Sequence, residues 1–253
     1  MKKGSLFTGC KALPFALTCL AGSWSDATPP PASLSLARIH DKEDLKEKRF
    51  DLKWLEDGDS YTFLRKSEQE KYKESKEIWL SAATNPDHPE ILVSAEELVT
   101  GQSEPPLEID GYALSPDRSL LLLYTNSERV WRRNSRGDYW IYNLQAKTLH
   151  KLGGPDAAPS SLMFAKLSPR GTHVAYVREA NIHIESLEDH SIRTLTTNSN
   201  NQIFNGRFDW VYEEELGVRD GFRWSPDGKA IAYWQFDETG VRKQTLVDNV
   251  SNL

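Results

Sequence analysis

Cysteine is nearly absent from the sequence. The 253 residues hold only Cys10 and Cys19, both close to the N-terminus. If that segment is removed on maturation, no disulfide, reactive thiol or cysteine metal site remains. A positive charge excess is also lacking, since the formal net charge is -6. Proteins that bind nucleic acid through its phosphates present a basic face, so this composition argues against a nucleic-acid partner.

The motifs of several enzyme classes are also missing. The sequence has no Gly-x-Ser-x-Gly elbow, no Gly-rich phosphate loop and no alternation of strands with helices. No two histidines have the spacing of a zinc-binding helix. We therefore expect no catalytic residue, no cofactor and no metal site in this chain. All six histidines are interpreted as structural or surface residues: His40, His88, His150, His173, His183 and His190.

The N-terminus has the pattern of an export signal. Lys2, Lys3 and Lys11 precede the short apolar run "ALPFALTCLAG", and small residues follow up to Ala27. The run is too short to span a bilayer as a stable helix. The pattern predicts a signal peptide over 1–27, a Pro-rich spacer over 28–36 and a folded domain over 37–253, exported to the periplasm or the cell exterior. An uncleaved signal would leave a weak membrane anchor.

Four segments of the remaining chain share one layout, an apolar residue, a turn and then a strand. They are "KWLEDGDSYTFLRK", "ALSPDRSLLLLYTN", "KLSPRGTHVAYVRE" and "RWSPDGKAIAYWQF". Ser115, Ser168 and Ser225 mark the last three turns, at intervals of 53 and 57 residues. A repeat of this length, built from short strands, is typical of β-propeller blades. A β-sandwich is the alternative, but its strand spacing would be shorter than this period.

The fold class is therefore all-β, a partial propeller of about four antiparallel four-stranded blades. The last residues, "TLVDNVSNL", resemble the middle of a strand meander, so we expect the propeller to be incomplete.

Three consecutive carboxylates, Glu213 to Glu215, interrupt this pattern in "FDWVYEEEL". Adjacent acidic residues most often lie on a solvated surface. Neighbouring side chains diverge by about 100° on a helix and face opposite sides on a strand. Convergence of these carboxylates would therefore need a turn or a short helical or irregular insert.

Two motifs resemble the dipeptidyl peptidase IV family of prolyl-oligopeptidase-like serine peptidases. "DWVYEEEL" is followed by "FRWSPDGKAIAYWQFDE", and "ERVWRRNSRGDYWIYN" lies upstream, in the order found in that family. The resemblance implies an N-terminal propeller that carries substrate-binding residues. The family's catalytic serine lies on a C-terminal α/β-hydrolase domain, which we expect as a partner and which is absent from this chain.

The resemblance also implies roles for individual residues. Glu214 and Glu215 match the carboxylates that bind the free N-terminal ammonium of a peptide, and Arg132 matches the arginine that contacts the substrate. Glu213, Tyr212 and Trp210 would support them. Arg133 and Asn134 depart from the family's His-Ser pair, which affects the local hydrogen bonding. Without the resemblance, Arg132 could equally be an exposed member of an arginine cluster.

Two functional hypotheses follow. In one, the chain is the propeller part of an exported dipeptidyl-peptidase-type enzyme, supports removal of N-terminal dipeptides and is inactive alone. In the other, it is a stand-alone propeller that binds peptides or proteins without hydrolysing them. Homodimer formation is left open in both.

Overall fold

The computed structural model describes residues 35, 36, 40, 51–101, 104–198, 200, 202–242 and 244. The chain divides into two compact units, Met1–Phe50 and Asp51–Leu253. The predicted signal peptide and almost all of the predicted spacer lie outside the described residues. No helix in the described part of the chain has the length and apolar character needed to cross a membrane.

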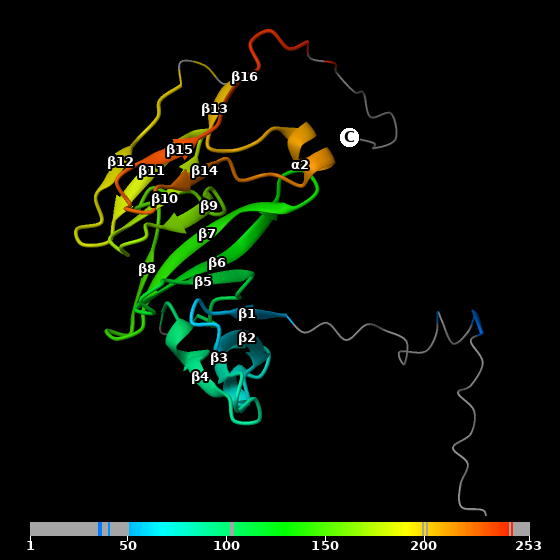
Figure 1. Cartoon of the computed structure of the whole chain (residues 1–253), viewed down its shortest axis with the longest axis vertical. Helices are drawn as coiled ribbons and strands as arrows, with labels where there is room; N and C mark the ends of the chain where they lie inside the picture. Colours follow the sequence, from blue (N-terminus) through cyan, green and yellow to red (C-terminus); the bar gives the residue numbers. More distant parts are fainter. Residues whose placement is uncertain are drawn as a thin grey trace, which may run out of the picture. The chain divides into compact units, whose positions relative to one another are not determined.

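The second unit begins with three four-stranded antiparallel sheets, one after another along the chain (Figure 1). The first contains β1 (Leu52–Trp54), β2 (Ser60–Lys66), β3 (Lys76–Ala82) and β4 (Glu90–Val93). The second contains β5 (Gly111–Leu114), β6 (Leu120–Arg129), β7 (Asn134–Asn143) and β8 (Thr148–Lys151). The third contains β9 (Met163–Leu167), β10 (His173–Arg178), β11 (Asn181–Ser186) and β12 (Ile192–Thr194). Two short 3-10 helices accompany the first sheet: η2 (Glu70–Tyr72) lies between β2 and β3, and η3 (Glu96–Leu98) follows β4.

The repeated turn joins the first two strands of each of these sheets. In the second sheet, the Ser115 amide donates to the Leu120 carbonyl at 2.8 Å, and the Ser115 hydroxyl accepts from the Leu120 amide at 2.9 Å. Ser168 and Ser225 form the equivalent backbone bonds in their units, both at 2.8 Å. The predicted repeat is thus confirmed as a repeated hairpin.

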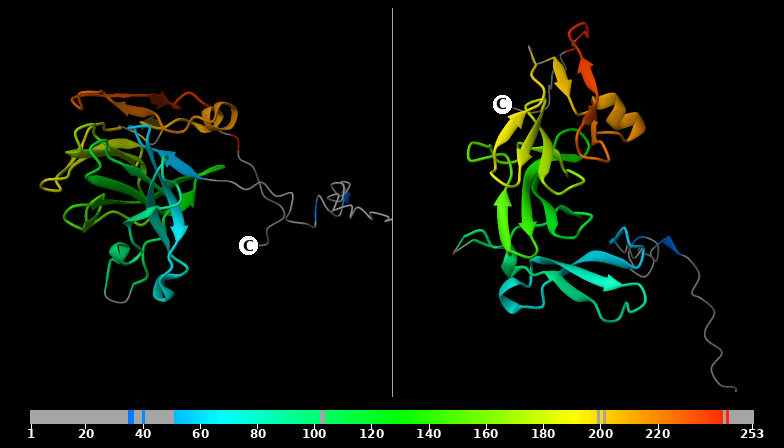
Figure 2. Two further views of the ribbon diagram at one scale, coloured as in Figure 1. Left: turned by 60° about the horizontal axis from the view of Figure 1, so that its bottom comes forward. Right: turned by 60° about the vertical axis from the view of Figure 1, so that its left-hand side comes forward.

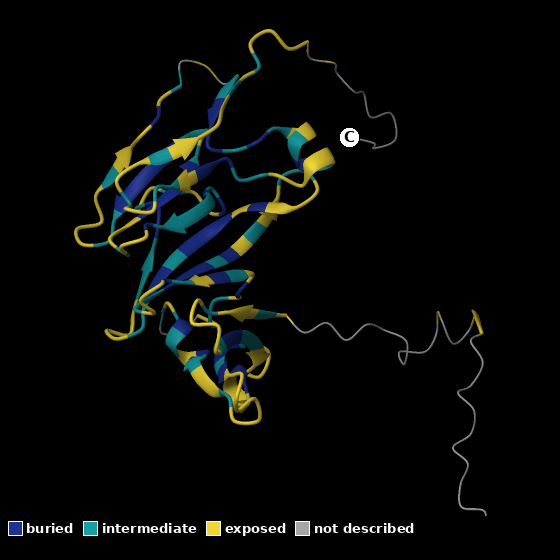
Figure 3. Cartoon of the chain, viewed as in Figure 1, coloured by how far each residue is buried: buried dark blue, intermediate teal, exposed yellow. Residues whose placement is uncertain are grey.

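Hydrophobic clusters join each sheet to the next. Ile78 of the first sheet packs in one cluster with Leu121 and Leu123 of the second. Tyr139 of the second sheet shares a cluster with Val174 and Tyr176 of the third. The buried residues therefore run through the faces between consecutive sheets, as Figure 3 shows, and this is how propeller blades pack.

The fourth unit departs from a regular blade. It contains β13 (Ile203–Asn205), helix α2 (Trp210–Leu216), β14 (Phe222–Trp224), β15 (Ile231–Tyr233) and β16 (Gln235–Asp237). Its strands form two separate two-stranded ladders, β13 with β16 and β14 with β15. The predicted partial propeller of four units is confirmed, while this last unit is not a single four-stranded sheet.

Three backbone hydrogen bonds join the two ladders of the fourth unit. The Gly221 amide donates to the Gly206 carbonyl at 3.0 Å, and the Gly206 and Trp234 amides donate to the Trp234 and Gly221 carbonyls, each at 2.9 Å. A Cβ atom on Gly221 would lie 2.9 Å from the backbone nitrogen of Arg207. The glycine is thus needed for this close backbone approach. Helix α2 lies on the connection between β13 and β14 (Figure 2).

Candidate functional site

Helix α2 begins and ends at residues whose conformations define its length. Asp209 is the N-cap, and its side chain accepts a hydrogen bond from the Tyr212 amide at 3.0 Å. Gly217 follows the last turn with φ 66, the left-handed conformation that glycine adopts without strain. The helix has seven residues. The local sequence therefore encodes a short helix that carries all three glutamates, in agreement with the expected helical insert.

An aromatic cluster holds one face of α2 against the fourth unit. The Phe208 ring lies 5.0 Å from that of Tyr212 and 5.7 Å from those of Trp234 and Phe236, measured between centroids. Tyr212 also meets Phe236 edge to face at 5.4 Å. Tyr212 thus anchors the helix. Trp210, in the first turn of the same helix, is 52% exposed.

The three glutamates face different surroundings because α2 is regularly helical. Glu213 is buried, with 7% of its surface exposed, the Glu214 side chain is 19% exposed, and Glu215 is fully on the surface. Glu213 therefore turns toward the protein interior, and Glu214 lies at the boundary. Glu214 and Glu215 start from backbone positions about 100° apart on the helix, so Glu215 is the more exposed of the two.

Arg132 approaches α2 from a different sheet. It lies at the tip of the long hairpin formed by β6 and β7, and its Nε atom forms an ion pair with Oε2 of Glu214. Figure 1 shows this hairpin extending beyond its sheet toward α2. The structure thus brings together Arg132 and Glu214, two of the three residues for which the sequence predicts substrate binding. Arg133, which follows, is exposed.

Irregular pairing and a buried polar group direct the hairpin toward the helix. The β6–β7 register shifts between Thr125 and Glu128, and Asn126 has φ 47. There the Asp138 carboxylate accepts hydrogen bonds from the Asn126 side chain and the Ser160 amide, both at 3.0 Å. Bulges of this kind bend a strand pair and change its direction. The Asp138 group therefore fixes the point at which the hairpin leaves the sheet.

A second arginine, Arg207, lies between the hairpin and the fourth unit. Its guanidinium carbon is 4.2 Å from the centroid of the Phe204 ring and 6.0 Å from that of Trp131. Burial lowers the pKa of Arg207, and the charge of Glu238 opposes this shift. Arg207 is not among the residues that the sequence motifs predict for the site. Its position in "NGRFD", immediately before the helix, was the available signal.

Two carboxylate oxygens at this site lack a hydrogen-bond donor. Within the described residues, Glu213 Oε1 and Glu214 Oε2 are buried and accept no hydrogen bond. Glu214 Oε2 does contact Arg132, but the contact is an ion pair that lacks hydrogen-bond geometry. Buried carboxylate oxygens are normally paired, because leaving them without a donor is costly. The site is therefore able to accept hydrogen bonds from a cationic donor.

Comparison with known proteins relates this site to a peptidase family. Residues 115–252, which hold Arg132 and the three glutamates, match the family described as "Dipeptidyl peptidase IV (DPP IV) N-terminal region". Dipeptidyl aminopeptidase B of Saccharomyces cerevisiae is 34% identical over 137 residues, covering 53% of this chain and 16% of that protein. Prolyl endopeptidase FAP of Mus musculus is 36% identical over 132 residues, covering 51% of this chain and 17% of that protein. The chain thus spans about a sixth of the length of these curated relatives.

Solved structures with the same fold bear related names. Dipeptidyl peptidase 4 of Porphyromonas gingivalis superposes with a TM-score of 0.63 at 28% identity, covering 74% of this chain and 25% of that one. A putative dipeptidyl aminopeptidase IV of Bacteroides ovatus shares the fold, with a TM-score of 0.52 at 16% identity over 82% of this chain and 25% of that one. With a family match over more than half of its residues, this chain belongs to the dipeptidyl peptidase IV N-terminal region family.

Proposed function

We propose that α2 and the β6–β7 hairpin together bind the free N-terminus of a peptide, and that this recognition supports removal of N-terminal dipeptides by an exported serine peptidase. The contact between Arg132 and Glu214 carries the proposal. It places a cationic donor and an anionic acceptor side by side, although one residue comes from the β6–β7 hairpin of the second unit and the other from helix α2 of the fourth.

Glu214 has the properties required to bind an ammonium group. Its carboxylate is mostly buried, and Oε2 is paired with the cationic Arg132 side chain. A peptide α-amino group has an ordinary pKa of about 8, so most of it is charged at neutral pH. It presents three donors, and a charge-assisted bond to a carboxylate is about twice as strong as a neutral one. Glu214 is thus the principal acceptor.

Arg132 is suited to the first carbonyl oxygen of the same peptide. The α-ammonium and that carbonyl belong to one residue, so the groups that recognise them must be neighbours in the protein. The Arg132 side chain is 67% exposed. Its five N–H donors allow it to pair with Glu214 and a substrate oxygen together.

The other two glutamates have supporting roles in this proposal. Glu215 is exposed on the adjacent face of α2 and supplies a second carboxylate from the solvent side. Glu213 lies on the buried face of α2 and adds negative charge that favours a cationic ligand. An acylated peptide has no ammonium and leaves these charges without a partner, so it is rejected.

Fixing the N-terminus would set the distance to the peptide bond that is cut. A bound ammonium holds the second peptide bond at a constant position, and a nucleophile placed there releases dipeptides. The sequence has no Gly-x-Ser-x-Gly elbow, so this chain contributes recognition and the nucleophile comes from a partner α/β-hydrolase domain. The second candidate function is a propeller that binds peptides without hydrolysing them. The lack of a Gly-x-Ser-x-Gly elbow in the sequence is compatible with this candidate as well.

The direct test is a binding measurement with two forms of one peptide. A Gly-Pro peptide labelled at its C-terminus is titrated with the full chain, with its N-terminus either free or acetylated, and fluorescence anisotropy is recorded. We expect the free form to bind at least tenfold more tightly, and Glu214→Gln to remove most of the difference. Arg132→Gln should weaken both forms, because its carbonyl contact does not depend on the ammonium.

Two exposed residues of the same charge types provide matched controls. Arg133→Gln and Glu188→Gln remove the same charges from exposed positions outside the site, and each should bind as the unmodified chain does. Equal affinity for the free and acetylated peptides would overturn the proposal. Hydrolysis of a chromogenic Gly-Pro amide by the chain alone would overturn its division between recognition and catalysis.

A further inference from the structure

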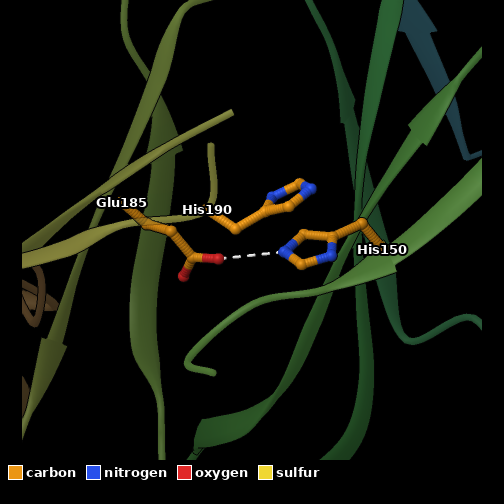
Figure 4. A group of neighbouring side chains, drawn as sticks. All are labelled: His150, Glu185 and His190. Carbon is orange, nitrogen blue, oxygen red and sulfur yellow. Dashed lines mark hydrogen bonds and ion pairs between the residues drawn. The ribbon is translucent and has the colours of Figure 1, made fainter. Parts of the chain in front are cut away.

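Two histidines and a glutamate meet at the boundary between the second and third sheets. His150 lies in β8, Glu185 in β11 and His190 in the turn between β11 and β12. One ligand atom from each lies within 4.8 Å of the others. Nε2 of His150 is 3.0 Å from Oε1 of Glu185, and the two imidazole rings stack with centroids 3.8 Å apart. Figure 4 shows the carboxylate pointing at the His150 ring, with the His190 ring beside it.

Glu185 is fully buried, and its second oxygen is already held in place. Oε2 accepts hydrogen bonds from the Gly153 amide at 2.8 Å and the Tyr176 hydroxyl at 3.2 Å. Oε1 is thereby fixed toward the two imidazoles. Outer contacts of this kind orient the carboxylate ligands of metal sites and are part of their affinity.

The boundary between the first and second sheets contains a comparable carboxylate that is paired with a cation. Lys147 and His190 occupy the same place in two equivalent turns, since their amides donate to the carbonyls of Asn143 and Ser186, four residues earlier, at 2.9 and 3.1 Å. In the earlier boundary, the Lys147 ammonium lies 2.8 Å from Oε1 of Glu97, which also accepts from the Tyr142 hydroxyl. There, a fixed cation balances the carboxylate between the sheets.

The later boundary has a buried carboxylate but no lysine or arginine in that turn. His190 occupies the place of Lys147, and a second imidazole, His150, faces the carboxylate from the adjoining sheet. Neutral imidazole is a metal ligand and carries no charge of its own. A divalent ion bound by the two imidazoles would bring a positive charge to this carboxylate from the same side.

We propose that His150, Glu185 and His190 bind one divalent transition-metal ion, with Zn²⁺ as the best match. Two imidazoles and one carboxylate are a common ligand set for zinc, with a water as the fourth ligand. Tetrahedral zinc places its ligand atoms about 3.4 Å apart, so the ligand atoms must move inward and the stacked rings must turn until their nitrogens converge. His190 is exposed in a turn and can supply that movement.

The ion would join consecutive blades of the propeller. It would replace the direct contact between His150 and Glu185, and it would be bound by residues of the second sheet and the third at once. Since binding to the folded state alone stabilises that state, saturation should raise the unfolding temperature of the chain.

The test compares ion binding by the full chain and by a variant that keeps the fold. His190 has φ 58, and asparagine tolerates this conformation better than alanine, so His190→Asn removes the imidazole without added backbone strain. Isothermal titration with ZnCl₂ should show one saturable site that is at least about tenfold weaker in His190→Asn and in His150→Asn. Co²⁺ as a substitute ion should give the visible absorption of tetrahedral coordination in the unmodified chain only.

His88→Asn is the matched control, because His88 is an exposed histidine in a loop of the first sheet. It should bind Zn²⁺ as the unmodified chain does. Cys10 and Cys19 are present in every variant, so ion binding by their thiols is common to all of them. No saturable site in the unmodified chain, or equal affinity in His190→Asn, would overturn the proposal.

Discussion

Asp138 in β7 and Asn126 in β6 are joined side chain to side chain, with Nδ2 of Asn126 3.0 Å from Oδ2 of Asp138. This contact lies where the β6–β7 hairpin leaves regular pairing, far along the chain from the glutamates of α2. The same carboxylate accepts from the Ser160 amide and forms an ion pair with Lys151. The direction of the Arg132 hairpin therefore depends on one buried acidic group.

Asp138→Ala should both destabilise the chain and weaken peptide binding. The free energy of unfolding should fall by about 1–3 kcal/mol, because the buried Ser160 amide loses its partner. Urea denaturation and peptide anisotropy measure the two effects. Glu128→Ala on the same hairpin breaks only an exposed ion pair with Arg136, and it should cost less than about 1 kcal/mol. Similar costs for both would contradict this role of Asp138.

Gly221→Ala should destabilise the fourth unit. The added methyl group would lie 2.9 Å from the Arg207 nitrogen and 3.0 Å from the Gly206 carbonyl carbon, both backbone atoms that cannot easily move. We expect a loss of about 1–3 kcal/mol in the free energy of unfolding. Gly240→Ala is the control, because no atom lies within 4 Å of its added Cβ, and it should stay within about 0.5 kcal/mol of the unmodified chain.

Stability should fall in mild acid because of His183. Burial lowers the pKa of His183 below its ordinary value of 6.5, and the charge of Arg178 adds to the shift. As the pH falls below 6.5, the unfolded chain takes up this proton before the folded chain does. The contribution of His183 is thus complete above pH 6.5 and is lost as the pH falls toward the folded-state pKa. His183→Gln should flatten that part of a pH series of urea denaturations, and parallel profiles would contradict the assignment.

Lys166 should produce a second rise of stability with pH, on the alkaline side. Burial lowers the pKa of Lys166 from 10.5 to about 8, although the charge of Asp220 opposes this. Between these two values the unfolded chain binds the extra proton, so the free energy of unfolding rises with pH. Lys166→Met should lack that rise relative to the unmodified chain when the two are compared by thermal unfolding from pH 7 to 10. A difference between them that does not vary with pH would refute the prediction.

The repeated hairpins could be predicted because their signal is local. Ser168 and Ser225 each bond within five residues of themselves, so the same letters produce the same turn. The caps of the short helix, Asp209 and Gly217, are also local, although the sequence predicted only a short helical or irregular insert at this place. The family resemblance, and not a local pattern, related Arg132 to the glutamates. No local pattern could do so, because Arg132 lies in the β6–β7 hairpin and the glutamates lie far along the chain on α2.

The remaining features depend on contacts between distant parts of the chain. The split of the fourth unit into two ladders depends on the close approach of Gly206 and Gly221. His150 and His190 stack only because consecutive sheets lie face to face. No spacing rule for a zinc helix applies to ligands that come from two different blades.

The segment from Ile231 to Asp237 pairs with β14 through its first half and with β13 through its second. It therefore fastens both strands that flank α2, yet it follows the helix in the chain. During synthesis, the glutamates leave the ribosome before the strand that holds them in place. The proposed recognition site of a nascent chain is thus completed only after residue 237 has emerged, when the earlier blades have already had time to fold.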